Sequence, residues 1–201
     1  MAQSVNFDRA VPYYDNTRGF PPGLDAQSAA LIAQAADLKD THTVLEIGIG
    51  TGRMALPLST HVGTVYGADI STGMLGELLA KRTDERVFPT QADAARLPYP
   101  ANSLDGVLVS HVFHLVADLP GVVAELERVL KPDGVVAHCW SHDGGALYAL
   151  RQAWRQITDH GGTGDRWQIA QTILDDSGWT HRTTQTLDYI RQQTPISVIE
   201  K

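Results

Sequence analysis

The sequence is poor in cysteine, in basic residues and in long apolar runs. Its 201 residues include one cysteine, Cys139, so no disulfide can form within the chain. Lys and Arg number 16 against 23 Asp and Glu, and the formal net charge of −7 offers no basic field to nucleic acid or an acidic membrane. We find no membrane-spanning run and no signal peptide. These absences predict a cytoplasmic protein with a small or neutral partner.

The length suits one domain and is short for two. Apolar stretches with strand and helix periodicities alternate from residue 24 onward, which predicts an α/β fold with a mainly parallel sheet and helices on both faces. The expected helices are residues 24–38, 52–58, 71–81 and 120–130, and the expected strands are residues 43–47, 63–69, 86–90, 104–110 and 135–140.

Three alternating glycines, Gly48, Gly50 and Gly52, follow the first expected strand. Glycine takes positive φ easily and lets a ligand approach the backbone. A dinucleotide-binding loop begun at Gly48 needs its third glycine at position 53, where the chain has Arg53. Glu46, beside the loop, would repel a pyrophosphate but suits a positively charged nitrogen. The loop therefore predicts a nucleoside ligand other than a nicotinamide dinucleotide.

Asp69 ends the second expected strand. A carboxylate at this position of an α/β fold can accept hydrogen bonds from both hydroxyls of a ribose. Since the sequence suggests no other partner for Asp69, we assign it to the ribose.

The glycine motif and three later ones, at residues 91–105, 106–114 and 125–134, together resemble the class I S-adenosylmethionine-dependent methyltransferases, in particular the branch with quinone-biosynthesis and other small-molecule enzymes. The resemblance implies a three-layer Rossmann-like fold with strand order 3-2-1-4-5-6 and methyl transfer from S-adenosylmethionine to an oxygen, nitrogen or carbon of a small-molecule acceptor. The family's seventh, antiparallel strand is expected to be missing because the chain stops at Lys201. An exposed sheet edge would then allow a homo-oligomer.

The resemblance also assigns the adenine site. Asp93 would accept a hydrogen bond from the adenine amino group, and the backbone N–H of Ala94 would donate to a ring nitrogen. Ile70 and Met74 would flank the ring as apolar walls.

Residues 1–23 are interpreted as a lid segment before a single domain at 24–201, because residues 7–20 resemble the segment that folds over the cofactor in related enzymes. Tyr13 and Tyr14 would face the sulfonium, and Arg18 would hold the cofactor carboxylate. The alternative is an ordinary surface helix.

The end of the fourth expected strand carries Ser110, His111 and, further on, His114. Open parallel sheets bind ligands at this end of their strands. Ser110 and His111 are assigned to the cofactor, and His114 is the candidate base for the acceptor. The alternative for His114 is pocket lining. We expect no metal site, because no third ligand is placed near these histidines and because His138 and Cys139 of the next strand face opposite ways.

After Trp140 we expect helices at 147–160 and 167–176 and a strand within 179–190. Two other functions stay open, a non-catalytic S-adenosylmethionine-binding protein and a nicotinamide-dependent oxidoreductase. Methylation of nucleic-acid amino groups is disfavoured, because the Asn/Asp-Pro-Pro-aromatic motif of those enzymes is replaced by Ser-His-Val-Phe at 110–113.

Overall fold

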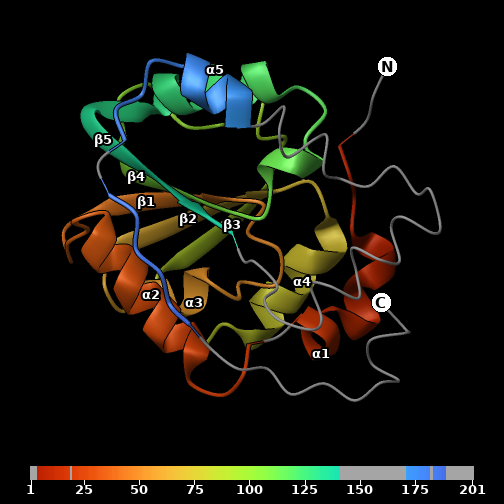
Figure 1. Ribbon diagram of the computed structural model, residues 1–201. Helices are drawn as coiled ribbons and strands as arrows, with labels where there is room; N and C mark the ends of the chain where they lie inside the picture. The colour runs from red at the N-terminus through yellow and green to blue at the C-terminus, as the bar shows by residue number, and fades with distance from the viewer. Residues whose placement is uncertain (1–3, 19, 141–170, 182, 189–201) are drawn as a thin grey trace, which may run out of the picture.

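The computed structural model is a parallel sheet between two layers of helices (Figure 1). It describes residues 4–18, 20–140, 171–181 and 183–188. Five strands lie in the order β3-β2-β1-β4-β5, all parallel, which confirms the α/β fold and the first five positions of the expected order. The strands are β1 (Thr43–Ile47), β2 (Thr64–Asp69), β3 (Val87–Gln91), β4 (Leu104–Ser110) and β5 (Leu130–Cys139).

Helices cover both faces of this sheet. One face carries α2 (Leu24–Ala35), α3 (Ala55–Leu58) and α4 (Thr72–Lys81), and the other carries α5 (Leu119–Val129) (Figure 1). The N-terminal segment forms η1 (Asp8–Tyr13) and α1 (Tyr14–Arg18), and η2 (Phe113–Leu115) follows β4. Two helices begin at side-chain caps, since Ser71 accepts from the Met74 amide before α4 and Asp118 from the Gly121 amide before α5.

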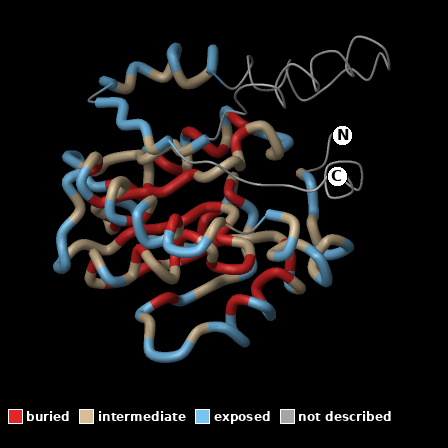
Figure 2. The backbone as a smooth tube through the Cα atoms, turned by 60° about the horizontal axis from the view of Figure 1, so that its bottom comes forward, coloured by how far each residue is buried: buried red, intermediate tan, exposed pale blue. Residues whose placement is uncertain are grey.

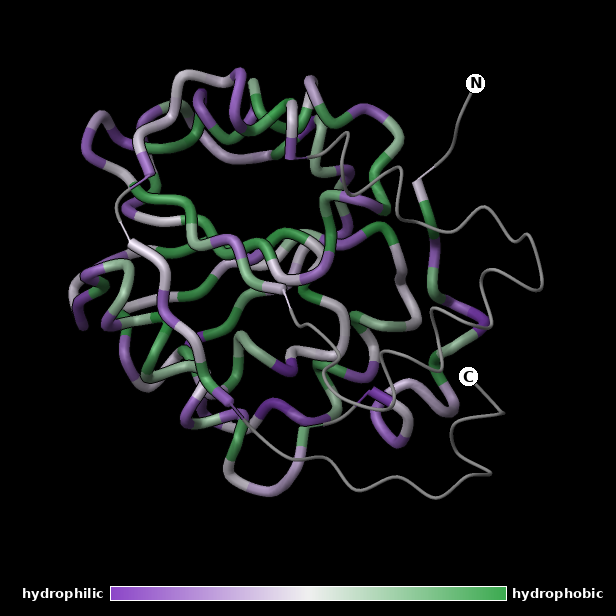
Figure 3. The backbone as a smooth tube through the Cα atoms, in the orientation of Figure 1, coloured by the Kyte–Doolittle hydropathy of each residue, from purple (hydrophilic) through white to green (hydrophobic). Residues whose placement is uncertain are grey.

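The sheet separates two apolar cores, because neighbouring strand residues point to opposite faces. Leu45 and Val107 belong to the core under α5, whereas Val44 and Leu108 belong to the core under α2, α3 and α4. All four are at most 1% exposed, so the central strands are buried on both sides (Figures 2 and 3). This rigid centre fixes the loops at the carboxyl ends of the strands.

Two expectations for the C-terminal half are wrong. The β5 ladder begins at Leu130, paired with Leu104, and a register shift absorbs residues 131–134 before Val135 pairs with Gly106. We expected a turn there and a strand only from 135. The expected strand within 179–190 is also wrong, since residues 179–181 and 183–188 form no strand and are mostly exposed, with no apolar face to bury.

Residues 171–176 are helical, as expected, and Ile173 and Leu174 pack against the core under α5. Trp179 follows them and donates from its indole nitrogen to Glu127 of α5 at 3.1 Å. The expected helix at 147–160 and the start of the one at 167–176 lie outside the described residues. Over the described ranges, no helix is both long enough and apolar enough to cross a membrane.

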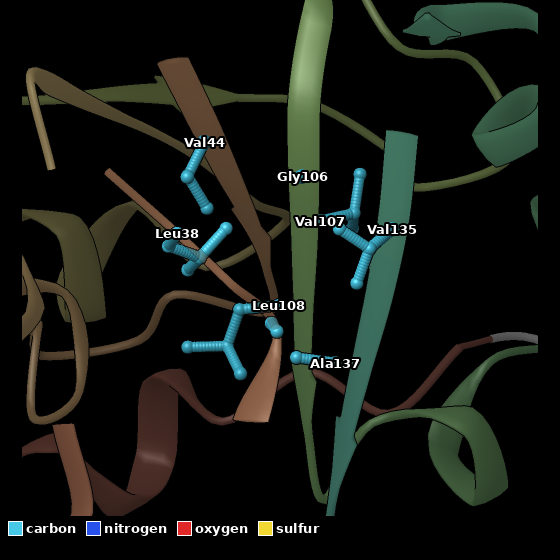
Figure 4. A pocket seen from close by; sticks show the side chains of 8 residues that line it. Leu38, Val44, Gly106, Val107, Leu108, Val135 and Ala137 are labelled. Carbon is cyan, nitrogen blue, oxygen red and sulfur yellow. The ribbon is translucent and has the colours of Figure 1, made fainter. Parts of the chain in front are cut away.

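A small apolar gap lies between the segment after α2 and strands β1, β4 and β5 (Figure 4). Its lining includes Leu38, Val44, Gly106 and Val135 and contains no titratable side chain. Val44 and Gly106 lie near the amino ends of their strands, away from the glycine loop that follows β1. The gap therefore offers no chemistry to a site at the carboxyl ends.

Candidate functional site

The glycine loop joins β1 to α3, and its three glycines have φ of +65°, +54° and +78°. A Cβ on Gly48 would lie 2.3 Å from a methyl of Val112, and one on Gly52 would lie 2.8 Å from Leu78. These two glycines are therefore required by packing. A Cβ on Gly50 would meet no atom closer than 3.9 Å. Gly50 thus borders open space, as a loop that receives a ligand requires.

Asp69, at the end of β2, holds this loop in place. One of its carboxylate oxygens accepts from the Gly50 amide at 2.9 Å, and the other accepts from the Ser71 amide at 2.8 Å. The assumption that Asp69 lacks a partner in the chain is therefore wrong. Burial raises its pKa, and the backbone hydrogen bonds oppose that rise. Each oxygen keeps a further lone pair, so the carboxylate can still accept from a ribose.

Glu46 lies in β1 immediately before the loop and is only 3% exposed. Its pKa is raised to about 8, chiefly by burial and also by the nearby Asp69, while Arg53 and the backbone of Ala55 oppose the rise. Its Oε2 atom is buried and accepts no hydrogen bond from any residue that the structure describes. A buried carboxylate oxygen without a donor fits the ammonium group of S-adenosylmethionine.

The residues that we expect to bind adenine, Asp93 and Ala94, lie on the loop after β3, next to the end of β2. The Ala92 amide donates to the Asp69 carbonyl at 3.0 Å, which brings the loop after β3 to the end of β2. Asp93 is exposed and accepts from the Ala95 amide at 3.0 Å. The Ala94 amide makes no hydrogen bond within the described ranges and so remains available as a donor. Their roles toward adenine stay predictions.

The two expected apolar walls differ in exposure. Ile70 is half-buried, and its carbonyl accepts from the Gln91 side chain at 3.3 Å, so it lies against the end of β3. Met74, in the first turn of α4, is only 2% exposed. Met74 can therefore contact a ligand only with the edge of its side chain.

The N-terminal segment crosses the carboxyl end of the sheet. Near its start, the Val5 amide donates to the carbonyl of Leu115, in the loop after β4, at 3.0 Å. Further along, Asp8 accepts from the Ser71 hydroxyl at 2.5 Å and from the Gly73 amide at 3.1 Å, at the start of α4.

A third anchor ties α1 to the glycine loop. Asp15 accepts from the Thr51 hydroxyl at 2.6 Å and from Lys81 of α4. The Lys81 ammonium in turn lies 3.4 Å from the Thr51 carbonyl. Sequence reasoning missed this contact, because 36 residues separate Asp15 from Thr51 and no local pattern links them. Tyr14 is half-buried and Arg18 exposed in the same helix, so their contact with cofactor stays a prediction.

Three imidazoles occupy the carboxyl ends of β4 and β5. His111 has a φ of +58°, which is unusual for a residue with a side chain, and its amide donates to the Cys139 carbonyl at 3.1 Å. Burial, followed by the charges of Arg53 and His114, lowers the pKa of His111 to about 4. Burial and then His114 lower the pKa of His138 to about 4. His111 and His138 are therefore neutral near pH 7.

An aromatic group extends from these imidazoles. The His138 ring lies 4.9 Å from the Phe113 ring and 5.1 Å from the Trp140 ring, centroid to centroid. His138 thus faces the core under α5, whereas Cys139 packs on the opposite core, as expected for neighbouring strand residues. No group of metal-ligating side chains occurs in the described part of the chain. His114 and Ser110 are half-buried at the same end of the sheet.

Comparison with known proteins agrees with this geometry. Residues 45–138 match a family model described as a methyltransferase domain. A demethylmenaquinone methyltransferase of Streptomyces avermitilis is 31% identical over 138 residues, which are 68% of this chain and 59% of that protein. The chain belongs to the class I S-adenosylmethionine-dependent methyltransferases. The biotin biosynthesis bifunctional protein BioHC of Cellvibrio japonicus is 32% identical over 160 residues, which are 80% of this chain and 30% of that protein.

The chain spans less than two thirds of the length of either relative. Among solved structures, an S-adenosylmethionine-dependent methyltransferase from Aquifex aeolicus superposes with a TM-score of 0.64 at 23% identity, over 85% of this chain and 87% of that one. At that identity the likeness shows a shared fold.

Proposed function

We propose that this chain transfers the methyl group of S-adenosylmethionine to a small-molecule acceptor. The observation that supports the proposal most is the contact between the glycine loop and Asp69. The Gly50 amide donates a hydrogen bond to the Asp69 carboxylate, while the Cβ position of Gly50 borders open space. A ribose beside Asp69 therefore meets backbone at Gly50 and no side chain.

The cofactor lies, in this proposal, across the ends of β1 and β2. Glu46 takes the ammonium group, Asp69 takes the ribose, and the Ala94 amide donates to the adenine ring. When bound, the cofactor supplies a methyl group that is already electrophilic. The protein then has to align the acceptor, exclude water and, for some acceptors, remove a proton.

The acceptor approaches from the end of β4. Support for a small acceptor comes from the net charge of −7 and from the N-terminal segment, which crosses this end of the sheet. The name of the Streptomyces relative favours a quinone-like ring. The imidazoles and Trp140, which is exposed beside His138, are suited to contact such a ring.

His114 is the proposed base for an acceptor that carries a proton on its reacting atom. We expect His114→Ala to slow methyl transfer by roughly 10²–10⁴-fold in single turnover, with cofactor affinity unchanged. Transfer within a few-fold of the wild-type rate would reduce His114 to pocket lining.

The test of the function is transfer of a labelled methyl group to phenols, hydroxyquinones, carboxylic acids and amines, with S-adenosylhomocysteine measured as the second product. We expect stoichiometric formation of both products with at least one class. Tight binding of the cofactor without turnover on any class would instead support a non-catalytic binding protein.

A further inference from the structure

Arg53 follows the last glycine of the loop and is half-buried. Its guanidinium carbon lies 4.4 Å from the centroid of the Phe20 ring, so a cation–π contact covers one face of the group. It forms no hydrogen bond and no salt bridge with any residue that the structure describes. Its guanidinium N–H donors are thus left without an acceptor in the part of the chain that the structure describes.

Arg53 lies between the glycine loop, where it directly follows Gly52, and Phe20 of the N-terminal segment. Burial has the largest effect on the pKa of Glu46, Asp15 and His111, and the charge of Arg53 lowers the pKa of all three. These groups belong to β1, the N-terminal segment and the end of β4. The charge of Arg53 thus acts on all three of these parts of the site.

Arg53 and Glu46 attract each other and yet form no salt bridge. Among the described residues, the Oε2 atom of Glu46 has no donor and the N–H groups of Arg53 have no acceptor. Once Glu46 loses its proton, the two side chains provide one negative and one positive group beside the glycine loop. The zwitterionic end of an amino acid, with its ammonium and carboxylate on one carbon, complements such a pair.

We propose that Arg53 binds the carboxylate of the methionine end of the cofactor while Glu46 binds its ammonium group. The inference rests on the proposed function and assigns the carboxylate to Arg53 in place of Arg18. Arg18 is exposed at the end of α1, so its side chain must be ordered on binding, whereas Phe20 already restricts the guanidinium of Arg53. A planar guanidinium binds a carboxylate through two parallel hydrogen bonds.

The experiment compares two ligands by calorimetry. S-adenosylhomocysteine carries the amino-acid end, and 5′-methylthioadenosine shares its nucleoside and thioether without that end. We expect Arg53→Met to weaken binding of S-adenosylhomocysteine roughly 10- to 100-fold, the worth of hydrogen bonds to a charged group, and to leave binding of 5′-methylthioadenosine unchanged. Arg53→Lys keeps the charge without the paired geometry. Its affinity for S-adenosylhomocysteine should fall between those of the wild-type protein and Arg53→Met.

Arg18→Met is the matched variant, and we expect it to preserve the preference for S-adenosylhomocysteine. Loss of that preference in Arg18→Met and not in Arg53→Met would overturn the inference. An equal loss for both ligands in Arg53→Met would also overturn it, since a collapsed loop affects both. Wild-type protein that binds neither compound would refute the proposed function itself, whereas the other results leave that function standing.

Discussion

Gly50 and Gly23 have similar backbones and different surroundings, which separates strain from ligand contact. Both have positive φ, +54° and +79°, and a Cβ on Gly23 would meet nothing within 4 Å. Alanine at either position should cost about 1–2 kcal/mol of stability, the penalty of a left-handed conformation. Only at Gly50 does the new Cβ enter the proposed ligand space.

We therefore expect substitution of Gly50 to abolish binding of S-adenosylhomocysteine, with Gly50→Val more severe than Gly50→Ala. The Gly23→Ala variant should bind normally. Thermal unfolding and calorimetry on the three variants give the two effects separately. A folded Gly50→Val variant with normal affinity would show that the ligand does not approach this loop.

Glu46 makes cofactor binding depend on pH. Its pKa rises from 4.5 to about 8 in the free protein, so the folded state holds a proton that the unfolded state has lost. The stability from this group is full below pH 4.5 and is lost as the pH rises toward 8. Because an ammonium ligand needs the ionised carboxylate, binding at pH 6–7 should release this proton.

We expect the affinity for S-adenosylhomocysteine to rise with pH, by at most about tenfold per unit, and to level off near pH 8. Calorimetry in two buffers of different ionisation enthalpy counts the protons released. Glu46→Gln should remove both the proton release and the pH dependence. A flat affinity in the wild-type protein would place the ammonium group elsewhere.

Sequence alone located individual site residues better than the contacts among them. The glycine spacing located Gly50, and the expected strands put Glu46 beside the loop and Asp69 at the end of the second strand. The bond from the Gly50 amide to Asp69 and the separation of Arg53 from Glu46 depend on how three loops meet, and no local pattern encodes that. For this reason the sequence alone used Arg53 only to exclude a dinucleotide-binding loop.

At the scale of elements, the N-terminal segment is the part whose movement the cofactor would require. Asp15 and Thr51 join α1 to the glycine loop, with Lys81 as a second donor to Asp15. Asp15→Ala and Thr51→Val should each release α1, raising hydrogen exchange over residues 7–18 and speeding dissociation of S-adenosylhomocysteine.

The two variants should not be additive, because each removes the same contact. Thr51→Ser keeps the hydroxyl and should restore slow dissociation, and Glu77→Ala, an exposed acid on α4, serves as the control. Unchanged exchange over residues 7–18 in both Asp15→Ala and Thr51→Val would return the segment to an ordinary surface helix.

Helices and strands were predictable where burial makes apolar residues recur at the period of the element. The strands from β1 to β4 and helices α4 and α5 lie within a few residues of their expected positions, because each has an apolar face. The start of β5 was missed, since Pro132-Asp133-Gly134 is typical of a turn and the ladder passes it only through a register shift. The strand expected within 179–190 had little support in its residues, since between 179 and 188 only Trp179 and Leu187 are apolar.

At the scale of the whole molecule, β3 and β5 are the outer strands of the described sheet. Parallel edges of this kind can pair with another chain, and the homo-oligomer stays a prediction. The carboxyl end of the sheet is more informative, because the glycine loop, the imidazoles and the N-terminal segment all lie there. Fold alone does not fix chemistry, so the ligand at this end has to be identified directly.

Calorimetric titration of the wild-type chain with S-adenosylhomocysteine and, separately, with NAD⁺ tests the central claim most directly. The buried acid at Glu46 and the arginine at the position of a dinucleotide loop's third glycine predict saturable one-to-one binding of S-adenosylhomocysteine and none of NAD⁺. Binding of NAD⁺ in preference to S-adenosylhomocysteine would contradict the assignment of the glycine loop and of the function built on it.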